Sequence, residues 1–332
     1  MHYSMIAAVM AVTVSAAASA GQTGSITERG RAVSDWSSAE SVAALAAAAS
    51  PDLKAKIDAG GGPAAFSAAV DAQMGKQTNV FDEVEMTVNG LTFYQRLAAY
   101  ERAPAAMTTI VWDDKGTVAA ATVQPSSPPP PAPAAGTGVP VRPPFATPRA
   151  GTWFTFWGGR NLARNYHMVA PAQTYAFDLL VVKDGKSFSG PANEHASYYC
   201  WGEPVLAVAD GVVTEAVDGL PDMPIGDLGA KEAAGNHVIV RHGPDRHSLV
   251  AHLQRGSTKV KTGDTVKAGQ ALGLCGNSGR TSEPHIHFHL QTGATFADAG
   301  TGLPANFRDM LVDGRPVRDG EPVRGQAIAL AK

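Results

Sequence analysis

The chain has 332 residues, enough for two domains, and its composition is that of a globular protein, with 44% hydrophobic and 17% charged residues. Its formal net charge is −3, and positive charges do not gather into a run. The sequence therefore offers no basic stripe that would neutralise phosphates, and we expect no nucleic-acid partner.

Residues 1–20 are typical of an export signal. The stretch Met5–Ala20 is apolar and ends in small residues, and Ala18-Ser19-Ala20 fits an A-x-A cleavage site. A short N-terminal helix is the alternative interpretation. No other apolar run approaches the ~20 residues needed to cross a bilayer. The sequence thus predicts a cleaved signal peptide and a mature protein in the periplasm or outside the cell, without a membrane span.

Residues 21–124 carry helical patterns followed by strand patterns, which predicts a small α+β domain. Ser37 lies three residues before Glu40 and offers a capping box to the first long helix. Asn89-Gly90 and Lys115-Gly116 mark turns between strands. We expect helices over Ser38–Ala49, Asp52–Ile57 and Pro63–Met74, and strands over Val80–Thr87, Leu91–Tyr100, Met107–Trp112 and Val118–Val123.

The segment LTFYQRLAAYERAPAAMTTIVWDDKGTVAAATVQP, from Leu91 to Pro125, resembles the small nuclear-transport-factor-2-like domains that precede some exported peptidases. No histidine or cysteine lies between Gly21 and Arg160, so we expect no metal site or thiol nucleophile in this half. A binding, spacing or shielding role is expected instead. If this domain shields a site in the second half of the chain, deletion of Gly21–Pro144 should expose that site.

Residues 125–150 are predicted to link this domain to a second one. Pro125–Pro144 reads PSSPPPPAPAAGTGVPVRPP, and proline both fixes φ and removes a backbone donor, which favours an extended linker. Residues 151–332 contain short apolar runs separated by Gly and Pro, which predicts a mainly β domain of antiparallel sheet. The expected strands are Tyr175–Val182, Val205–Val208, Val212–Val217, His237–His242, Ser248–His252, Gln270–Cys275 and His285–Leu290.

Cys200 and Cys275 are the two cysteines of the chain, and their separation excludes a C-x-x-C redox motif. In an oxidising compartment they could form a disulfide. Two independent buried thiols are the alternative, since cysteine is often buried as a small apolar residue. The sequence leaves both open.

Nine of the ten histidines lie between His167 and His289, and three of them alternate in the tract PHIHFHL. In a strand, residues at i, i+2 and i+4 share one face. His285, His287 and His289 would therefore project to one side, while the apolar residues between them enter the core. Because neutral imidazole is a strong zinc ligand, this tract predicts a metal site.

The surroundings of this tract form a linked set of motifs. They are Gly202–Val205, Ala209–Val213, Gly235–Val238, Ala251–Leu253, Val260–Asp264, Lys267–Gln270, Gly276–Arg280 and Pro284–His287. Together they resemble the LytM or lysostaphin-type (M23) metallopeptidases, and the resemblance spans roughly Asn165–Leu290. It implies a zinc endopeptidase that hydrolyses peptide bonds in the stems or cross-links of peptidoglycan, at small residues. We expect a monomer.

The resemblance also implies the site residues. One zinc ion per chain would be held by His167, Asp178 and His287, which leaves the fourth tetrahedral position open to water. His252 and His285 would be the catalytic residues, one positioning the water proton and the other stabilising the oxyanion. The sequence does not decide which histidine has which role.

The first ligand departs from the usual family pattern. H-x-x-x-D would place a histidine at position 174, which is a threonine here. His167, within Asn165-Tyr166-His167, is the nearest upstream histidine, and we expect it to supply the missing ligand. A variant group of the family shares this arrangement, with an insertion corresponding to Lys183–Ser197.

The other histidines receive structural interpretations. His289 should lie beyond the metal's ligands, because a strand advances ~6.6 Å per two residues. His237 and His242 look like strand-end residues, and His247 lies beside a turn. His195, next to Glu194, is expected in a solvated loop, with a lid contact as the alternative.

Three other functions were compared with the enzyme. A degenerate LytM domain that binds and activates another wall hydrolase is favoured by Thr174, but it would not need Asp178, His252, His285 and His287 together. A biotinyl or lipoyl carrier would need a lysine in the turn Ala209–Gly211, which has none. A peptidase acting on a peptide outside the cell wall is not excluded by the sequence.

Overall fold

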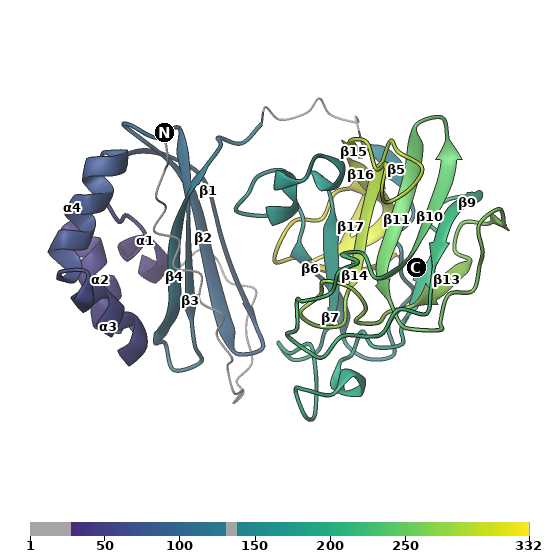
Figure 1. Cartoon of the computed structure of the whole chain (residues 1–332), viewed down its shortest axis with the longest axis horizontal. Coiled ribbons are helices and arrows are strands. Elements are labelled where there is room, and N and C mark those ends of the chain that lie inside the picture. The colour runs from purple at the N-terminus through teal and green to yellow at the C-terminus, as the bar shows by residue number, and fades with distance from the viewer. Residues whose placement is uncertain (1–27, 131–137, 332) are drawn as a thin grey trace. The chain divides into compact units, whose positions relative to one another are not determined.

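A computed structural model describes residues 28–130 and 138–331 of the chain. The predicted signal peptide, residues 1–20, lies outside the described residues. Two compact units are present (Figure 1): one contains residues up to 130 together with 161–163, and the other contains 131–160 and 164–332. Within the described ranges, no helix is long and apolar enough to cross a membrane.

The first unit is an antiparallel sheet with helices on one of its faces (Figure 1). Its sheet has the order β1-β2-β3-β4, so each strand pairs with its neighbour in the sequence. Positive φ at both Asn89 and Gly90 makes the tight turn between the first two strands that the sequence predicted. The elements are α1 Glu28–Ala32, α2 Ala39–Ala48, α3 Pro51–Ala59, α4 Gly62–Met74, β1 Gln77–Val88, β2 Leu91–Tyr100, β3 Ala105–Trp112 and β4 Val118–Ser126.

The start of α2 differs from the predicted capping box. The helix begins at Ala39, and the hydroxyl of Ser38 accepts a hydrogen bond from the Ser41 amide. Ser37 lies one residue too early to cap it and donates its hydroxyl to Asp35 instead. The prediction of Ser37 as the cap is therefore wrong, although a serine does begin the helix.

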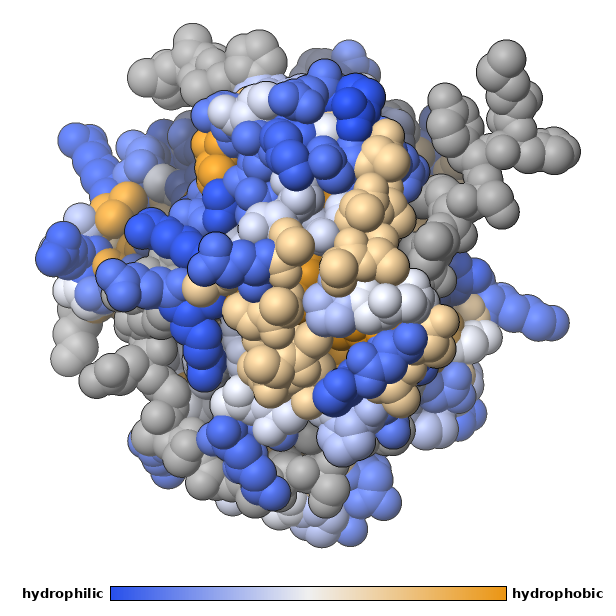
Figure 2. Space-filling model, turned by 90° about the vertical axis from the view of Figure 1, so that its left-hand side faces the viewer, coloured by the Kyte–Doolittle hydropathy of each residue, from blue (hydrophilic) through white to orange (hydrophobic). Residues whose placement is uncertain are grey.

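The helices pack on the sheet through a core around Tyr94, Leu45, Ile110 and Trp112. Their outward face carries many exposed alanines, and Figure 2 shows weakly hydrophobic side chains there among charged ones. Alanine favours the helix without adding much apolar surface. The high helix propensity of alanine therefore accounts for the many alanines on this exposed face.

The second unit is built almost entirely from strands, which confirms the predicted mainly β, antiparallel fold. Its twelve-stranded sheet contains the path β12-β9-β10-β11-β14-β7-β6-β18-β16-β17, with β15 beside β14 and β5 beside β16, while β8 and β13 form a separate pair. The strands are β5 Val139–Val141, β6 Thr152–Trp157, β7 Phe177–Val182, β8 Pro204–Leu206, β9 Gly211–Val217, β10 Asn236–Gly243, β11 Arg246–Leu253, β12 Thr265–Val266, β13 Ala271–Leu274, β14 Ile286–Gln291, β15 Gly302–Leu303, β16 Ala305–Val312, β17 Arg315–Gly320 and β18 Ala327–Leu330. Short 3-10 helices η1 Tyr166–Val169, η2 Pro171–Gln173 and η3 His195–Ser197 lie in its loops.

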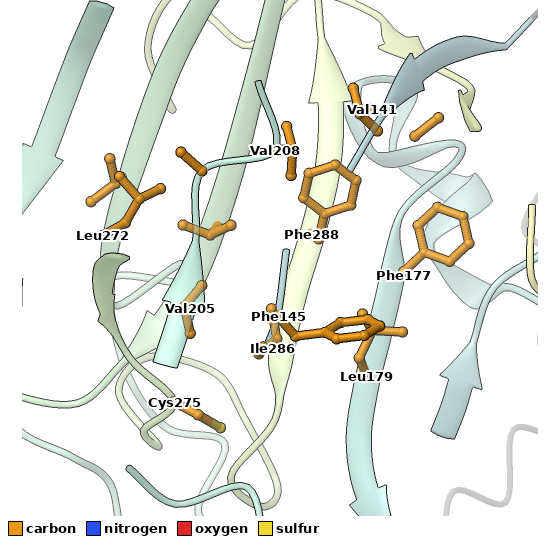
Figure 3. Close-up of a cluster of buried hydrophobic side chains, with 14 of the residues drawn as sticks. Val141, Phe145, Phe177, Leu179, Val205, Val208, Leu272, Cys275, Ile286 and Phe288 are labelled. Carbon is orange, nitrogen blue, oxygen red and sulfur yellow. The ribbon is translucent and has the colours of Figure 1, made fainter. Parts of the chain in front are cut away.

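The core of this unit contains the apolar side chains of the histidine tract. Ile286, Phe288 and Leu290 of β14 are fully buried in it, as the alternation predicted. Figure 3 shows Phe288 near Phe177 of β7 and Val208, with Ile286 next to Phe145. The other face of β14 is therefore free to present its polar side chains.

The predicted linker is shorter in the structure. Pro125 and Ser126 pair with β3 at the end of β4, and β5 pairs in parallel with β16. Pro140 is tolerated because β5 is an edge strand with a partner on one side alone. A truncation that removes the first unit should therefore end near Pro130, because cutting at Pro144 would delete β5.

A disulfide joins Cys200 to Cys275, with a Cα–Cα distance of 5.9 Å. Both cysteines are buried in the core. Cys275 follows β13, and the amide of the next residue, Gly276, donates to the carbonyl of His252. The bond thus anchors the segment that lies against the end of β11.

Replacing both cysteines with alanine is expected to lower the free energy of unfolding by up to about 4 kcal/mol, because the bond closes a loop with a sequence separation of 75. Urea unfolding of oxidised wild type and the double variant measures the difference. Reduced wild type should unfold like the double variant. Equal midpoints for all three proteins would show that the bond does not restrain the chain.

Candidate metal centre

Three buried side chains, His167, Asp178 and His287, meet in the second unit. Their possible ligand atoms all lie within 4.8 Å of one another. His167 Nε2 is 3.5 Å from Asp178 Oδ2, and His287 Nδ1 is 2.9 Å from Asp178 Oδ1. Across the described ranges, this is the sole group of three or more His, Cys, Asp or Glu side chains close enough to hold a metal. The structure thus brings together all three residues expected to be ligands.

Two members of this trio come from neighbouring strands. Asp178 of β7 is directly opposite His287 of β14 in the antiparallel register. Directly opposed residues project from the same face of a sheet and have neighbouring Cβ atoms. The sheet therefore sets the carboxylate beside the imidazole before any metal binds.

The third member, His167, lies on η1 in the loop before β7 and is held by Asn165. The Asn165 carbonyl oxygen accepts hydrogen bonds from the His167 amide and from Nδ1, at 3.2 and 2.9 Å. Its amide nitrogen donates to the carbonyls of Gly159 and Ala176, which fixes the orientation of the amide. His167 is thus left with Nε2 facing Asp178. Asn165 belongs to the motif Asn165-Tyr166-His167, but this orienting role could not be predicted from its residue type.

Thr174, at the position where the family usually has histidine, takes no part in the trio. Its hydroxyl donates to the carbonyl of Pro171 at 2.9 Å and so stabilises the end of η2. The loop before β7 therefore contributes His167, and not residue 174, to the trio.

His252 has a left-handed backbone, with φ of +60°. Ala251 is opposite His287 and therefore projects to the same face, so a regular strand would turn His252 toward the other face. The left-handed residue instead lets both Ala251 and His252 line one cleft. Such a conformation costs a bulky residue of order 1–3 kcal/mol and is typical of functional sites.

The rings of His252 and His285 are anchored through Nδ1. The Nδ1 atom of His252 donates to the Ser278 carbonyl at 2.8 Å, which directs the Nε2 atom to the opposite side of the ring. That of His285 lies 2.8 Å from the Glu283 carbonyl, and its Nε2 is 3.4 Å from Asp178 Oδ1. The ring centroids of the two histidines are 4.8 Å apart, so they form a pair beside the trio.

The protonation of these groups suits a cation. Burial alone would raise the pKa of the Asp178 carboxyl, but His167, His285 and His287 outweigh burial and hold the pKa well below its usual range. Burial lowers the pKa of His167 to about 4 and that of His252 well below its usual value. At neutral pH the carboxylate is charged and these two imidazoles offer lone pairs.

A cleft is lined by two members of the trio, His167 and His287. His167, His252 and His287 form its floor, and the small side chains of Ala233, Ala234 and Ala251 line it together with Tyr166 and Arg280. Tyr166 is half exposed. The cleft therefore offers an apolar wall for small side chains next to the polar floor.

The peptidase family M23 model matches residues 197–299. Residues 197–299 form an M23 peptidase domain. His252, His285 and His287 lie inside the matched part of the M23 domain, and β7 with Asp178 and the loop with His167 precede it. The nuclear-transport-factor-2-like character of the first unit stays a prediction.

Curated relatives of the M23 domain include two endopeptidases. Peptidoglycan DD-endopeptidase ShyC of Vibrio cholerae is 36% identical over 89 residues, which make up 27% of this chain and 17% of that protein. DD-carboxypeptidase/endopeptidase Mpg of Neisseria meningitidis is 34% identical over 90 residues, again 27% of this chain and 17% of that protein. The matched region thus covers less than a fifth of each relative.

Solved structures similar to this chain also carry M23 domains. The M23 metalloprotease pseudoalterin from the deep sea has a TM-score of 0.30 and 15% identity, covering 54% of this chain and 98% of its own. The catalytic domain of the prophage-encoded M23 protein EnpA from Enterococcus faecalis has a TM-score of 0.28 and 19% identity, covering 48% and 94%.

One of the remaining histidines, His195, is less exposed than the sequence predicted. His195 is half-buried, stacks on Trp201 with ring centroids 4.8 Å apart, and donates through Nε2 to the Met223 carbonyl. The expectation of a solvated side chain is therefore wrong, because the ring has an aromatic and a carbonyl partner. His289 lies beyond the trio, as expected, and burial lowers its pKa to about 3.

Proposed function

We propose that this protein is a zinc-dependent endopeptidase that hydrolyses peptide bonds of bacterial peptidoglycan. The observation that carries the proposal is a buried set of two imidazoles and one carboxylate, whose imidazoles line a cleft, with two further imidazoles beside the set. A structural zinc site would use four protein ligands, whereas a catalytic one uses three and keeps a position open.

The donor set fits zinc. Two imidazole nitrogens and one carboxylate oxygen are donors of the kinds that zinc takes, and Asp178 supplies the negative charge. His167, Asp178 and His287 are the proposed ligands. When bound, zinc would acidify a water molecule and polarise the scissile carbonyl.

His252 and His285 are the proposed catalytic residues, and their hydrogen bonds suggest different roles. With its proton on Nδ1, His252 keeps a lone pair on Nε2 and can accept a proton from the attacking water. His285 holds Nε2 within reach of a carboxylate oxygen, which favours a proton there. A protonated Nε2 can donate to the oxygen that becomes negative during attack.

The cleft suggests the substrate class. Three alanines, Leu249 and Phe296 make its wall largely apolar, which suits a peptide with apolar side chains such as the alanines of peptidoglycan stems. The name of one relative, the peptidoglycan DD-endopeptidase ShyC, points in the same direction. We propose that the protein acts outside the cytoplasm, in agreement with the export signal predicted for residues 1–20.

A second candidate is a catalytically inactive M23 domain that binds and activates another wall hydrolase. The observation in its favour is Thr174, which has no imidazole and bonds to Pro171. The two candidates differ in whether the purified protein itself cleaves.

Digestion of purified peptidoglycan tests the proposal. The protein, incubated with zinc, is expected to release peptides with new amino termini, which mass spectrometry assigns to one bond. A chelator should stop release, and added zinc should restore it. A protein that binds zinc without releasing any peptide would favour the inactive candidate, and one that binds no zinc would exclude both the metal and the enzyme.

The substitution His167→Ala tests the displaced ligand. Zinc affinity should fall at least about 100-fold, because His167 is one of three ligands and Asn165 has no other imidazole to orient. Competition with a chromophoric chelator measures the affinity. Thr174→Ala is the matched control and should bind zinc like wild type. The reverse pattern would mean that position 174 matters and His167 does not.

A further inference from the structure

A chain of hydrogen-bonded side chains runs along β14 away from the trio. It consists of His287, His289 and Gln291, at alternate positions of the strand and hence on one face. All three side chains are buried. The alternation of side chains along a strand explains why the three are neighbours. Their hydrogen bonds determine which ring nitrogen of each histidine carries the proton.

Gln291, at the far end of this hydrogen-bond chain, fixes which atom donates in each of its hydrogen bonds. The Gln291 amide nitrogen donates to the carbonyls of Gly293 and Thr295, at 3.0 and 3.1 Å. A flipped amide would point its oxygen at those two carbonyl oxygens, so the orientation is determined by the contacts. The Gln291 carbonyl oxygen is therefore an acceptor directed at His289.

His289, in the middle of this hydrogen-bond chain, donates to Gln291 and accepts from His287. His289 Nε2 lies 2.7 Å from the Gln291 oxygen and must carry a proton to donate to it. The hydrogen-bond partners of the buried His289 ring are one imidazole and one amide, so the ring is neutral and its Nδ1 has a lone pair. That Nδ1 is 3.0 Å from His287 Nε2 and accepts a hydrogen bond from it, so His287 carries its proton on Nε2.

The near end of the chain is the trio. With its proton on Nε2, His287 presents the lone pair of Nδ1, the atom that lies 2.9 Å from Asp178 Oδ1. Two acceptors face each other at that distance, which is favourable when a cation lies between or beside them. His167 is oriented through Nδ1 by a side chain of its own loop, whereas His287 needs a partner further along its strand.

We propose that His289 and Gln291 are positioning residues of the metal centre, which hold His287 in the tautomer and ring orientation that direct Nδ1 at zinc. This inference rests on the proposed function. Removing a side chain that hydrogen-bonds to a metal-ligating histidine typically lowers metal affinity about 10- to 100-fold. We expect a loss of zinc affinity in that range for His289→Leu, which removes the acceptor and keeps an apolar side chain of similar size.

Zinc alone is the probe, bound to the full-length protein in competition with a chelator. His289→Asn keeps an acceptor near the position of Nδ1 and should retain an affinity within about threefold of wild type, which separates positioning from packing. His242→Leu is the matched control: it removes a half-buried histidine of β10 that bonds to Asp210 and Ser248 and to no member of the trio or of this hydrogen-bond chain, and it should leave zinc affinity unchanged. Gln291→Leu reports on the same chain if His289→Leu does not fold.

Long-range 1H–15N spectra of the zinc-loaded protein give the second readout. In wild type and His289→Asn, the His287 ring should carry its proton on Nε2, and in His289→Leu this signal should shift or broaden. Wild-type affinity and spectra in both His289→Leu and Gln291→Leu would overturn the inference while leaving the enzyme intact. Failure of wild type itself to bind zinc would overturn the proposed function and this inference together.

Discussion

Replacing Asp178 with asparagine is expected to abolish zinc binding and to lower peptidoglycan hydrolysis at least about 1000-fold, which corresponds to about 4 kcal/mol of transition-state stabilisation. Asp178 is the only anionic member of the trio, and His167, His285 and His287 all lie within 3.5 Å of its oxygens. Asparagine keeps the size but gives up the charge. Metal analysis of the dialysed protein and muropeptide release measure the two losses.

Thermal unfolding gives an independent check on Asp178→Asn. Zinc should raise the melting temperature of wild type, because a ligand that binds the folded state stabilises it, and should leave the variant unchanged. Asp210→Asn is the matched control, since Asp210 is an exposed carboxylate that bonds to Lys267 and Ala268. Asp178→Asn protein that retains one zinc per chain would refute the assignment of Asp178 as a ligand.

Replacing His252 with glycine is expected to lower kcat by about 100- to 10,000-fold while zinc stays bound, because His252 is outside the trio. The variant should also be more stable than His252→Ala by about 1 kcal/mol, since only glycine adopts a φ of +60° without strain. Zinc analysis, muropeptide kinetics and urea unfolding of both variants test these expectations.

Asp245→Gly is the control for the backbone effect in His252→Gly. Asp245 also has a positive φ, of 49°, but it lies exposed in the turn between β10 and β11. It should gain stability without losing activity. Loss of zinc from His252→Gly would identify His252 as a ligand, and full activity would remove it from the catalytic residues.

The predictable part of the fold follows from periodic sequence patterns. Alternation in PHIHFHL placed Ile286, Phe288 and Leu290 in the core, and Asn89-Gly90 gave the first hairpin. β17, Arg315–Gly320, was missed because it is largely exposed and has no apolar alternation. β5 was missed because its proline argued against a strand, and only its place at a sheet edge makes that proline acceptable.

The candidate site shows the same division. Residue type and resemblance identified the five residues that the structure brings close to one another, three of which line the cleft. The residues that orient them, Asn165, Ser278 and Gln291, act through an amide or carbonyl whose partner is set by the folded chain. Spacing alone does not reveal such contacts, nor does it reveal the left-handed backbone of His252.

The pairing of Asp178 with His287 across β7 and β14 has a consequence for how such a centre can change during evolution. Two of its members are fixed by the sheet, whereas the third comes from the loop between β6 and β7, residues 158–176. A histidine can therefore move along this loop without altering any strand pairing, provided that the loop folds it back to the same point. The proposed first ligand at position 167, in place of 174, thus needs only a change in the fold of this loop, while the pairing of β7 with β14 stays the same.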